Sequence, residues 1–201
     1  MKLAIGFGSS FLNQYRTIMV RPDFDSSYSG DMILSAGPNH GPYCSSVISY
    51  LPVTTEGHIE VDSVRLMIDD DELQTSEIVE IILNVDDSRT SVLSAWFDPI
   101  MTELNSATNN STTWNEEEHI IHIPNEFCAP NTISQLPTFR FRMGDVDLVL
   151  YPEDYAYQHR SYCTAGIAFD YEDKIIFGNS LIGKIAYIFD ADEQRVGFCD
   201  P

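Results

Sequence analysis

Residues 81–93 read Ile81-Ile82-Leu83-Asn84-Val85-Asp86-Asp87-Ser88-Arg89-Thr90-Ser91-Val92-Leu93. The apolar residues at both ends predict β-strands, and the acidic and hydroxyl residues between them predict a turn. Acidic turns that end a strand are common, so this stretch by itself also fits a solvated turn without chemistry. The surrounding sequence decides between these two interpretations.

The rest of the chain consists largely of short β-branched and aromatic runs between clusters of Gly, Pro, Asn, Asp and Ser. This pattern predicts a mainly β fold of antiparallel sheets. The expected strands are Ile18–Val20, Gly30–Ala36, Val47–Pro52, His58–Ile68, Val79–Val85, His119–Ile123, Thr138–Met143, Val146–Tyr151, Cys163–Asp170, Ile185–Asp190 and Val196–Cys199. Apolar residues at helical spacing predict a helix over Ala95–Asn105, and single helical turns are expected at Pro152–Tyr157 and Asn179–Gly183. The polar stretch Asn105–Asn115 predicts a surface loop.

Charge and length exclude several classes of protein. The 201 residues are enough to bury one sizeable core, and 11 Lys and Arg against 31 Asp and Glu give a formal net charge of −20. Such a chain repels phosphate backbones and anionic membranes, so neither nucleic acid nor a membrane is expected as a partner. No stretch approaches the roughly 20 apolar residues that a membrane-spanning helix needs. The acidity also fits work at low pH, although solubility alone explains it.

The N-terminus and the cysteines bear on the compartment. The apolar run at Met1–Ser10 is interrupted by Gly6 and Gly8, so no signal peptide is predicted there. Four cysteines lie far apart without a C-x-x-C pair, which argues against zinc or thioredoxin-type chemistry and favours disulfides in an oxidising compartment. Asn109 and Asn110 begin overlapping N-x-S/T triplets, which matter if the chain is secreted.

The turn at residues 86–91 resembles the apolar-apolar-Asp-Thr/Ser-Gly-Thr/Ser-Thr/Ser motif of pepsin-like aspartic proteases. In this resemblance Asp87 falls on the catalytic aspartate and Ser88 on the hydroxyl residue after it. Arg89 stands where the family has glycine, and Thr90 and Ser91 form the following hydroxyl pair. The departure at Arg89 puts the activity in doubt.

Other segments resemble the same family in the same order along the chain. They are Ser29–Leu34, Ser49–Val53 and Ile59–Val64 as opening strands, Cys128–Pro130 with Ser134–Phe139, Ile175–Ile182 as the segment that crosses under the catalytic turn, and Tyr187–Asp190 with Arg195–Phe198 as the closing hairpin. Together they imply the C-terminal lobe of a pepsin-like acid protease over residues 30–201, with antiparallel sheets and one or two short helices. Residues 1–29 then correspond to the end of an N-terminal lobe and the connection between lobes. The first Asp-Thr-Gly turn and the flap of that lobe are expected to be missing.

The resemblance also implies pairings. Cys128 and Cys163 fall on the disulfide of the family's C-terminal lobe, whereas pairing of Cys44 with Cys199 is left open. Leu3–Phe7, Ile18–Val20, Ile185–Asp190 and Val196–Cys199 are expected to belong to the sheet that joins the two lobes. Without the first lobe, this sheet is expected to expose an apolar face and strand edges that favour association.

In this family, two aspartates from two lobes share one proton and activate a water, one as general base and the other as general acid. Asp87 is therefore the one predicted catalytic residue here, and Ser88, Thr90 and Ser91 are predicted to bind substrate. The guanidinium of Arg89 beside Asp87 would favour the ionised carboxylate unless it turns out to solvent. No metal or cofactor is expected, because His119 and His122 would lie on opposite faces of a strand.

Two functions remain open. The chain is predicted to be an aspartic-type endopeptidase family member, inactive as a lone lobe, that acts on peptide or protein substrates if a complementary N-terminal lobe or self-association completes the site. The alternative is a non-catalytic lobe that binds a peptide or protein. The family and the cysteines imply a secreted, vacuolar or lysosomal location.

Overall fold

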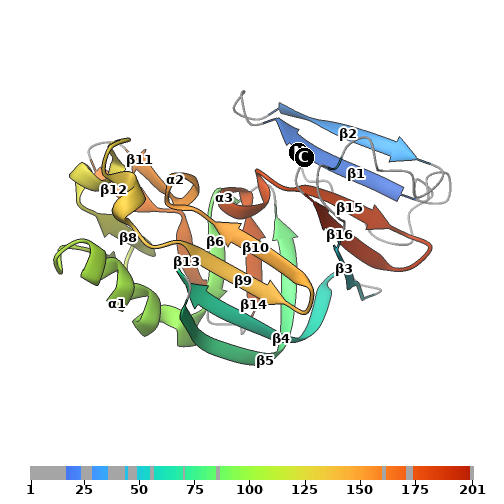
Figure 1. Ribbon diagram of the computed structural model, residues 1–201, viewed down its shortest axis with the longest axis horizontal. Coiled ribbons are helices and arrows are strands. Elements are labelled where there is room, and N and C mark those ends of the chain that lie inside the picture. The colour runs from blue at the N-terminus through green and yellow to red at the C-terminus, as the bar shows by residue number, and fades with distance from the viewer. Residues whose placement is uncertain are drawn as a thin grey trace.

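The computed structural model describes residues 17–23, 29–35, 44, 49–54, 57–69, 71–84, 87–159, 162–170 and 174–199. The strand expected at Leu3–Phe7 and the residue Asp86 lie outside these ranges. The described chain is mostly β, as predicted, and forms three sheets with a few short helices (Figure 1).

A five-stranded antiparallel sheet contains both ends of the described chain. Its order is β2 (Ser29–Ser35), β1 (Thr17–Asp23), β15 (Ala186–Asp190), β16 (Arg195–Cys199) and β3 (Ser49–Pro52). Strands β15 and β16 form the predicted hairpin, with Gln194 in the left-handed conformation at a φ of 49° in its turn. The three described segments expected to share one sheet therefore do so.

A seven-stranded sheet contains the strands on both sides of Asp87. Its order is β10 (Val146–Leu150), β9 (Phe139–Met143), β4 (Ile59–Ile68), β5 (Asp71–Asn84), β14 (Lys174–Gly178), β6 (Thr90–Leu93) and β13 (Ile167–Asp170). The sheet is mixed, because β14 pairs parallel with β5 and β13 pairs parallel with β6. The other pairs of this sheet are antiparallel, so the predicted, mostly antiparallel β fold is confirmed, with two parallel pairs between strands distant in sequence.

The third sheet has four antiparallel strands in the order β11 (Ala156–His159), β12 (Tyr162–Ala165), β8 (Ile120–Ile123) and β7 (Thr113–Asn115). The expected single strand Cys163–Asp170 is in fact two strands, β12 and β13, because Gly166 interrupts it and each half pairs in a different sheet. Strand β7 lies in the stretch predicted as a loop.

The helices agree with the sequence pattern. Helix α1 (Phe97–Ala107) follows the 3-10 turn η2 (Ser94–Trp96) and lies at the end of the molecule away from the five-stranded sheet (Figure 1). Its apolar stripe faces inward, since Ile100 and Leu104 have no exposed surface. The remaining short helices are η3 (Asn125–Cys128), η4 (Ile133–Gln135), α2 (Pro152–Tyr155) and α3 (Asn179–Ile182).

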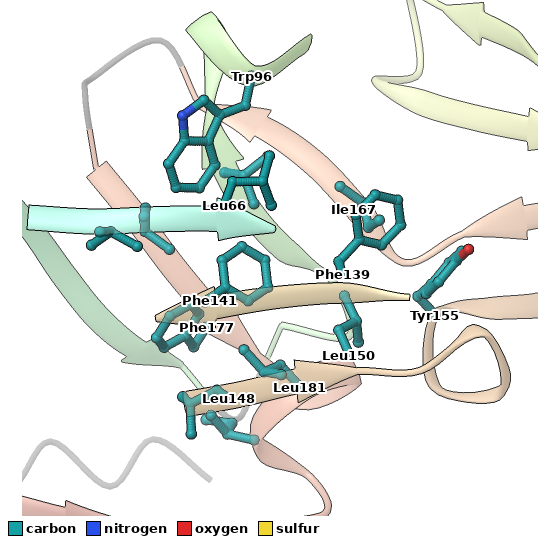
Figure 2. Packing of buried hydrophobic residues seen from close by; sticks show 14 of the residues in the cluster. Leu66, Trp96, Phe139, Phe141, Leu148, Leu150, Tyr155, Ile167, Phe177 and Leu181 are labelled. Atoms are coloured by element: carbon teal, nitrogen blue, oxygen red, sulfur yellow. The ribbon is translucent and has the colours of Figure 1, made fainter. Parts of the chain in front are cut away.

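The main hydrophobic core lies against the seven-stranded sheet. Figure 2 shows Phe141 from β9 beside Phe177 from β14, with their ring centroids 5.4 Å apart. Trp96 also packs near Phe141, at 6.2 Å between centroids. Alternate residues of β9 are buried, as expected for a strand with one face on the core. Each fully buried aromatic side chain of this kind contributes roughly 1.5–3 kcal/mol.

Two disulfides join distant parts of the chain. Cys128 and Cys163 are bonded with their Cα atoms 5.8 Å apart, which confirms the pairing that the resemblance implied. Cys44 and Cys199, left open by the sequence, are bonded as well, with a Cα separation of 5.7 Å. The second bond fastens the segment before β3 to the last strand.

The apolar face expected on the five-stranded sheet is not found among the described residues. Tyr187, Val196 and Phe198 pack into the main core, and Met19 and Ile188 belong to a small second cluster of buried residues. The large hydrophobic side chains that are exposed in the described ranges are Tyr151 and Tyr157, which lie outside this sheet. Buried clusters thus take up these described side chains, and the association of this sheet through its edges stays a prediction.

Candidate functional site

The Asp87 turn joins β5 to β6. The backbone N–H of Asp87 donates to the carbonyl oxygen of Asn84 at 3.3 Å, and the N–H of Arg89 donates to the Asp87 carboxylate at 2.9 Å. The Asp87 side chain keeps 30% of its surface exposed. A strand that ends in a tight turn thus presents one carboxylate that solvent can reach.

Strand β14 supports this turn from a distant part of the sequence. It lies between β5 and β6, and the backbone N–H of Asn179, just after it, donates to the carbonyl oxygen of Asp87 at 2.7 Å. A Cβ atom at Gly178 would lie 2.6 Å from the carbonyl carbon of Arg89 and 2.9 Å from the carbonyl oxygen of Asp87. The segment predicted to cross under the turn therefore does so, and its glycine allows the close approach.

A buried hydroxyl pair holds the far side of the turn. The side chain of Thr90 is fully buried, and its hydroxyl lies 2.9 Å from that of Ser180 at the start of α3. The Ser180 hydroxyl also reaches the carbonyl oxygen of Gly166 at 3.1 Å, and the Thr90 N–H donates to that same oxygen at 2.9 Å. These hydrogen bonds connect the Asp87 turn with helix α3 and with Gly166, the residue between β12 and β13.

The three hydroxyl residues predicted to bind substrate are in different environments. Ser88 is exposed at the tip of the turn, and Ser91 is half-buried on β6 opposite Ile176. Thr90 directs its hydroxyl into the lobe, toward Ser180. Contact of these residues with a substrate stays a prediction.

Arg89 does not turn away from the carboxylate. Its Nε lies 3.8 Å from the Asp87 carboxylate, and its Nη1 donates to the carbonyl oxygen of His119 at 3.1 Å. About a third of the Arg89 side chain is exposed, so the ion pair itself contributes at most about 1 kcal/mol. The guanidinium nevertheless occupies the position beside Asp87 where the family motif has a glycine without a side chain.

The two histidines considered as a ligand pair contact different neighbours. The ring of His119 lies 6.0 Å from that of Trp114, and the ring of His122 lies 4.5 Å from that of Tyr162. Within the described ranges, no group of three or more His, Cys, Asp or Glu is placed to hold a metal ion.

The clearest effects on acidity lie away from the Asp87 turn. Burial raises the pKa of Tyr187 to about 12 and the pKa of Tyr155 well above its usual value. The hydroxyl of Tyr155 donates to the carbonyl oxygen of Pro137 at 2.8 Å. These tyrosines are structural, and their burial disfavours the charged phenolate.

Sequence reasoning missed three contributors to the site. Ser180 and Gly166 hold Thr90, and His119 holds Arg89 through its carbonyl oxygen. The sequence could have indicated Ser180, because its hydroxyl follows directly after Gly178 and Asn179 in the segment that contacts the turn. It could not have indicated His119, because the contact is made by a backbone carbonyl, which every residue type carries.

Comparison with known proteins agrees with this geometry. None of the helices in the described ranges is long and apolar enough to cross a membrane. A search of curated proteins found no significant match. The family model for eukaryotic aspartyl proteases matches residues 25–200. The match covers most of the chain, and Gly178 of β14 packs against the Asp87 turn. The chain therefore belongs to the eukaryotic aspartyl protease family.

Proposed function

We propose that residues 30–201 act as the C-terminal lobe of an aspartic-type endopeptidase, in which Asp87 supplies one catalytic carboxylate, and that this chain alone does not hydrolyse peptide bonds. The observation that carries the proposal is the Asp87 turn itself. It presents a reachable carboxylate, yet that carboxylate has the Arg89 N–H at 2.9 Å and the Arg89 guanidinium beside it.

The reaction of this family needs two carboxylates that share one proton, so that acid and base act in the same step. The sequence contains no Asp-Thr-Gly or Asp-Ser-Gly triplet that would supply a second such turn. Arg89 places a permanent cation 3.8 Å from the Asp87 carboxylate, the group that would have to share a proton with a second carboxylate. One carboxylate can polarise a water, but it cannot also donate the proton that the leaving group requires.

The alternative is a lobe that binds a peptide or protein without cleaving it. The contact between Arg89 and the His119 carbonyl favours this function, because it fixes a cation on the surface beside Asp87. For the proteolytic function, the partner that completes the site is a separately supplied N-terminal lobe or a second copy of the chain. A second copy is the poorer partner because it would bring two Arg89 side chains together.

The test measures cleavage of an unfolded protein substrate between about pH 3 and 6, with and without pepstatin. It compares the chain alone, its Asp87→Asn variant, and both mixed with the N-terminal lobe of a full-length relative. Asp62→Asn, an exposed change on β4, is the matched control. We expect no cleavage by the chain alone and Asp87-dependent cleavage by the mixture.

Two results would change the assignment. Pepstatin-sensitive cleavage by the lone chain that Asp87→Asn abolishes would show that the chain completes its own site. A mixture that associates but does not cleave, with the chain or with an Arg89→Gly variant, would favour the binding function.

A further inference from the structure

The loop between α1 and β7 contains two candidate sites for N-linked glycosylation, which have no part in proteolysis. Asn109-Asn110-Ser111 and Asn110-Ser111-Thr112 are overlapping N-x-S/T triplets, and the 201-residue sequence contains no other. This triplet is the acceptor for N-linked glycans in the secretory pathway. Any N-linked glycan on this chain must therefore lie here.

The structure presents both asparagines to solvent. Asn109 and Asn110 are exposed and adopt left-handed backbone conformations, with φ of 53° and 60°, which asparagine tolerates better than most residues. In the part of the chain that is described, no hydrogen bond engages either side-chain amide. The acceptor nitrogens are therefore free to carry a large substituent.

The residues around them anchor the loop from the inside. Thr108 and Thr112 are buried, and their hydroxyls lie 2.8 Å apart. The N–H of Asn110 donates to the carbonyl oxygen of Asn105 at 2.7 Å, and the N–H of Thr112 donates to the Asn105 side chain at 3.2 Å. The loop thus has a fixed inner side and an outer side formed by the two asparagines.

The compartment is the second requirement. Cys44–Cys199 and Cys128–Cys163 are both bonded, and disulfides of this kind persist in the oxidising secretory pathway. In eukaryotes that pathway also contains the machinery for N-linked glycosylation. The disulfides and the triplets point independently to the same compartment.

We propose that Asn110 carries a single N-linked glycan. The amide Nδ2 attacks the anomeric carbon of a sugar carried on a polyprenyl pyrophosphate, so that a C–N bond forms and the C–O bond to pyrophosphate breaks. The lipid pyrophosphate leaves, and Nδ2 loses one proton. The transfer needs no oxidant or reductant.

Asn110 is preferred over Asn109 because the third residue of its triplet is Thr112, whereas the third residue of the Asn109 triplet is Ser111. The β-branched side chain of Thr112 has a restricted χ1, so presenting its hydroxyl to a transferase costs less entropy than presenting that of Ser111. The folded loop buries Thr112 against Thr108, so the transfer takes place before the loop folds. Adjacent glycans on both asparagines would collide, and one substituent excludes the other.

A glycan at Asn110 leaves the Asp87 turn accessible. Strand β7 separates the glycan loop from the turn at residues 116–119, whose His119 carbonyl binds Arg89. The three residues of β7 span about 10 Å, so the glycan begins at the opposite end of the β7–β8 hairpin. The modification is therefore compatible with either proposed function and independent of proteolytic activity.

The test expresses the full chain behind a cleavable secretory leader in eukaryotic cells and follows its electrophoretic mobility before and after peptide N-glycosidase. Asn110→Gln removes one triplet and keeps the Asn109 triplet. Ser111→Ala removes the Asn109 triplet and keeps that of Asn110, so it is the matched control. We expect a glycosidase-sensitive shift in the wild type and in Ser111→Ala, and a smaller shifted fraction in Asn110→Gln, where only the Asn109 triplet with its serine remains.

Mass spectrometry of the deglycosylated wild type locates the site without any variant, because the glycosidase converts the modified Asn to Asp. Aspartate at position 110 supports the proposal even if Asn110→Gln fails to fold. A secreted, disulfide-bonded wild type without any shift would overturn it. So would a modified Asn109 with an unmodified Asn110.

Discussion

Gly178→Ala tests the support of the Asp87 turn most directly. Gly178 has a φ of −90°, which any residue adopts, so the change introduces no backbone penalty of its own. The added Cβ would overlap the Arg89 carbonyl group, 2.6 Å from its carbon, and lie 2.9 Å from the Asp87 carbonyl oxygen. The effect is therefore purely steric.

The size of the effect follows from what the methyl group meets. Overpacking costs about 1–3 kcal/mol when flexible side chains can move aside. Here both neighbours are backbone, and the Asp87 carbonyl is fixed by the Asn179 N–H at 2.7 Å. We expect a loss of about 3 kcal/mol or more, which lowers the midpoint of urea unfolding by about 1 M at an m-value of about 2.5 kcal/mol/M.

The assay is urea unfolding followed by fluorescence, together with hydrogen exchange at the Asn179 and Thr90 amides, which bond within the site. Gly144→Ala is the control, because nothing lies within 4 Å of its Cβ and its φ of 57° predicts a loss of only about 1–2 kcal/mol. If Gly178→Ala has the wild-type midpoint and keeps both amides protected, the turn does not depend on this approach.

Three further predictions concern stability. Thr90→Val removes the hydroxyl contact with Ser180 and should lower the free energy of unfolding in urea by about 1–2 kcal/mol, whereas Thr90→Ser should lower it less. Equal midpoints for Thr90→Val and the wild type would contradict this prediction. Replacing Cys128 and Cys163 together by alanine opens a loop of sequence separation 35 and should cost about 4 kcal/mol, measured against the wild type without reductant; a loss below about 1 kcal/mol would argue against it. Burial raises the pKa of Tyr187 from 10.0 to about 12. The folded state is therefore fully stabilised by the neutral phenol below pH 10, and its free energy of unfolding should fall by up to about 3 kcal/mol as the pH rises to about 12. Tyr187→Phe should flatten that decline in urea unfolding, and an unchanged slope would refute the assignment.

The sequence predicted elements whose signals are local. The β15–β16 hairpin, the apolar stripe of α1 and the position of the Asp87 turn were all readable from neighbouring residues. Strand β5 was predicted from Val79, yet it begins at Asp71. Its first half is rich in polar and charged residues, so no apolar alternation marks it, and pairing with β4 stabilises it instead.

Long-range pairings were beyond local reasoning. The parallel pairs of β14 with β5 and of β13 with β6 depend on the whole topology, and short β7 gains its strand character from β8. The orientation of Arg89 was open for a similar reason, since the His119 carbonyl that holds it lies 30 residues away. Such contacts follow from the fold and leave no pattern in the sequence.

The strand order β5-β14-β6 has a kinetic consequence for the candidate site. The two strands joined by the Asp87 turn lie on either side of β14, so the turn cannot close as a local hairpin. Its hydroxyl contact alone spans 90 residues of sequence, from Thr90 to Ser180. Closing so long a loop is slow, and synthesis proceeds from the N-terminus. The Asp87 turn therefore takes its final shape only after the chain as far as Ser180 has left the ribosome.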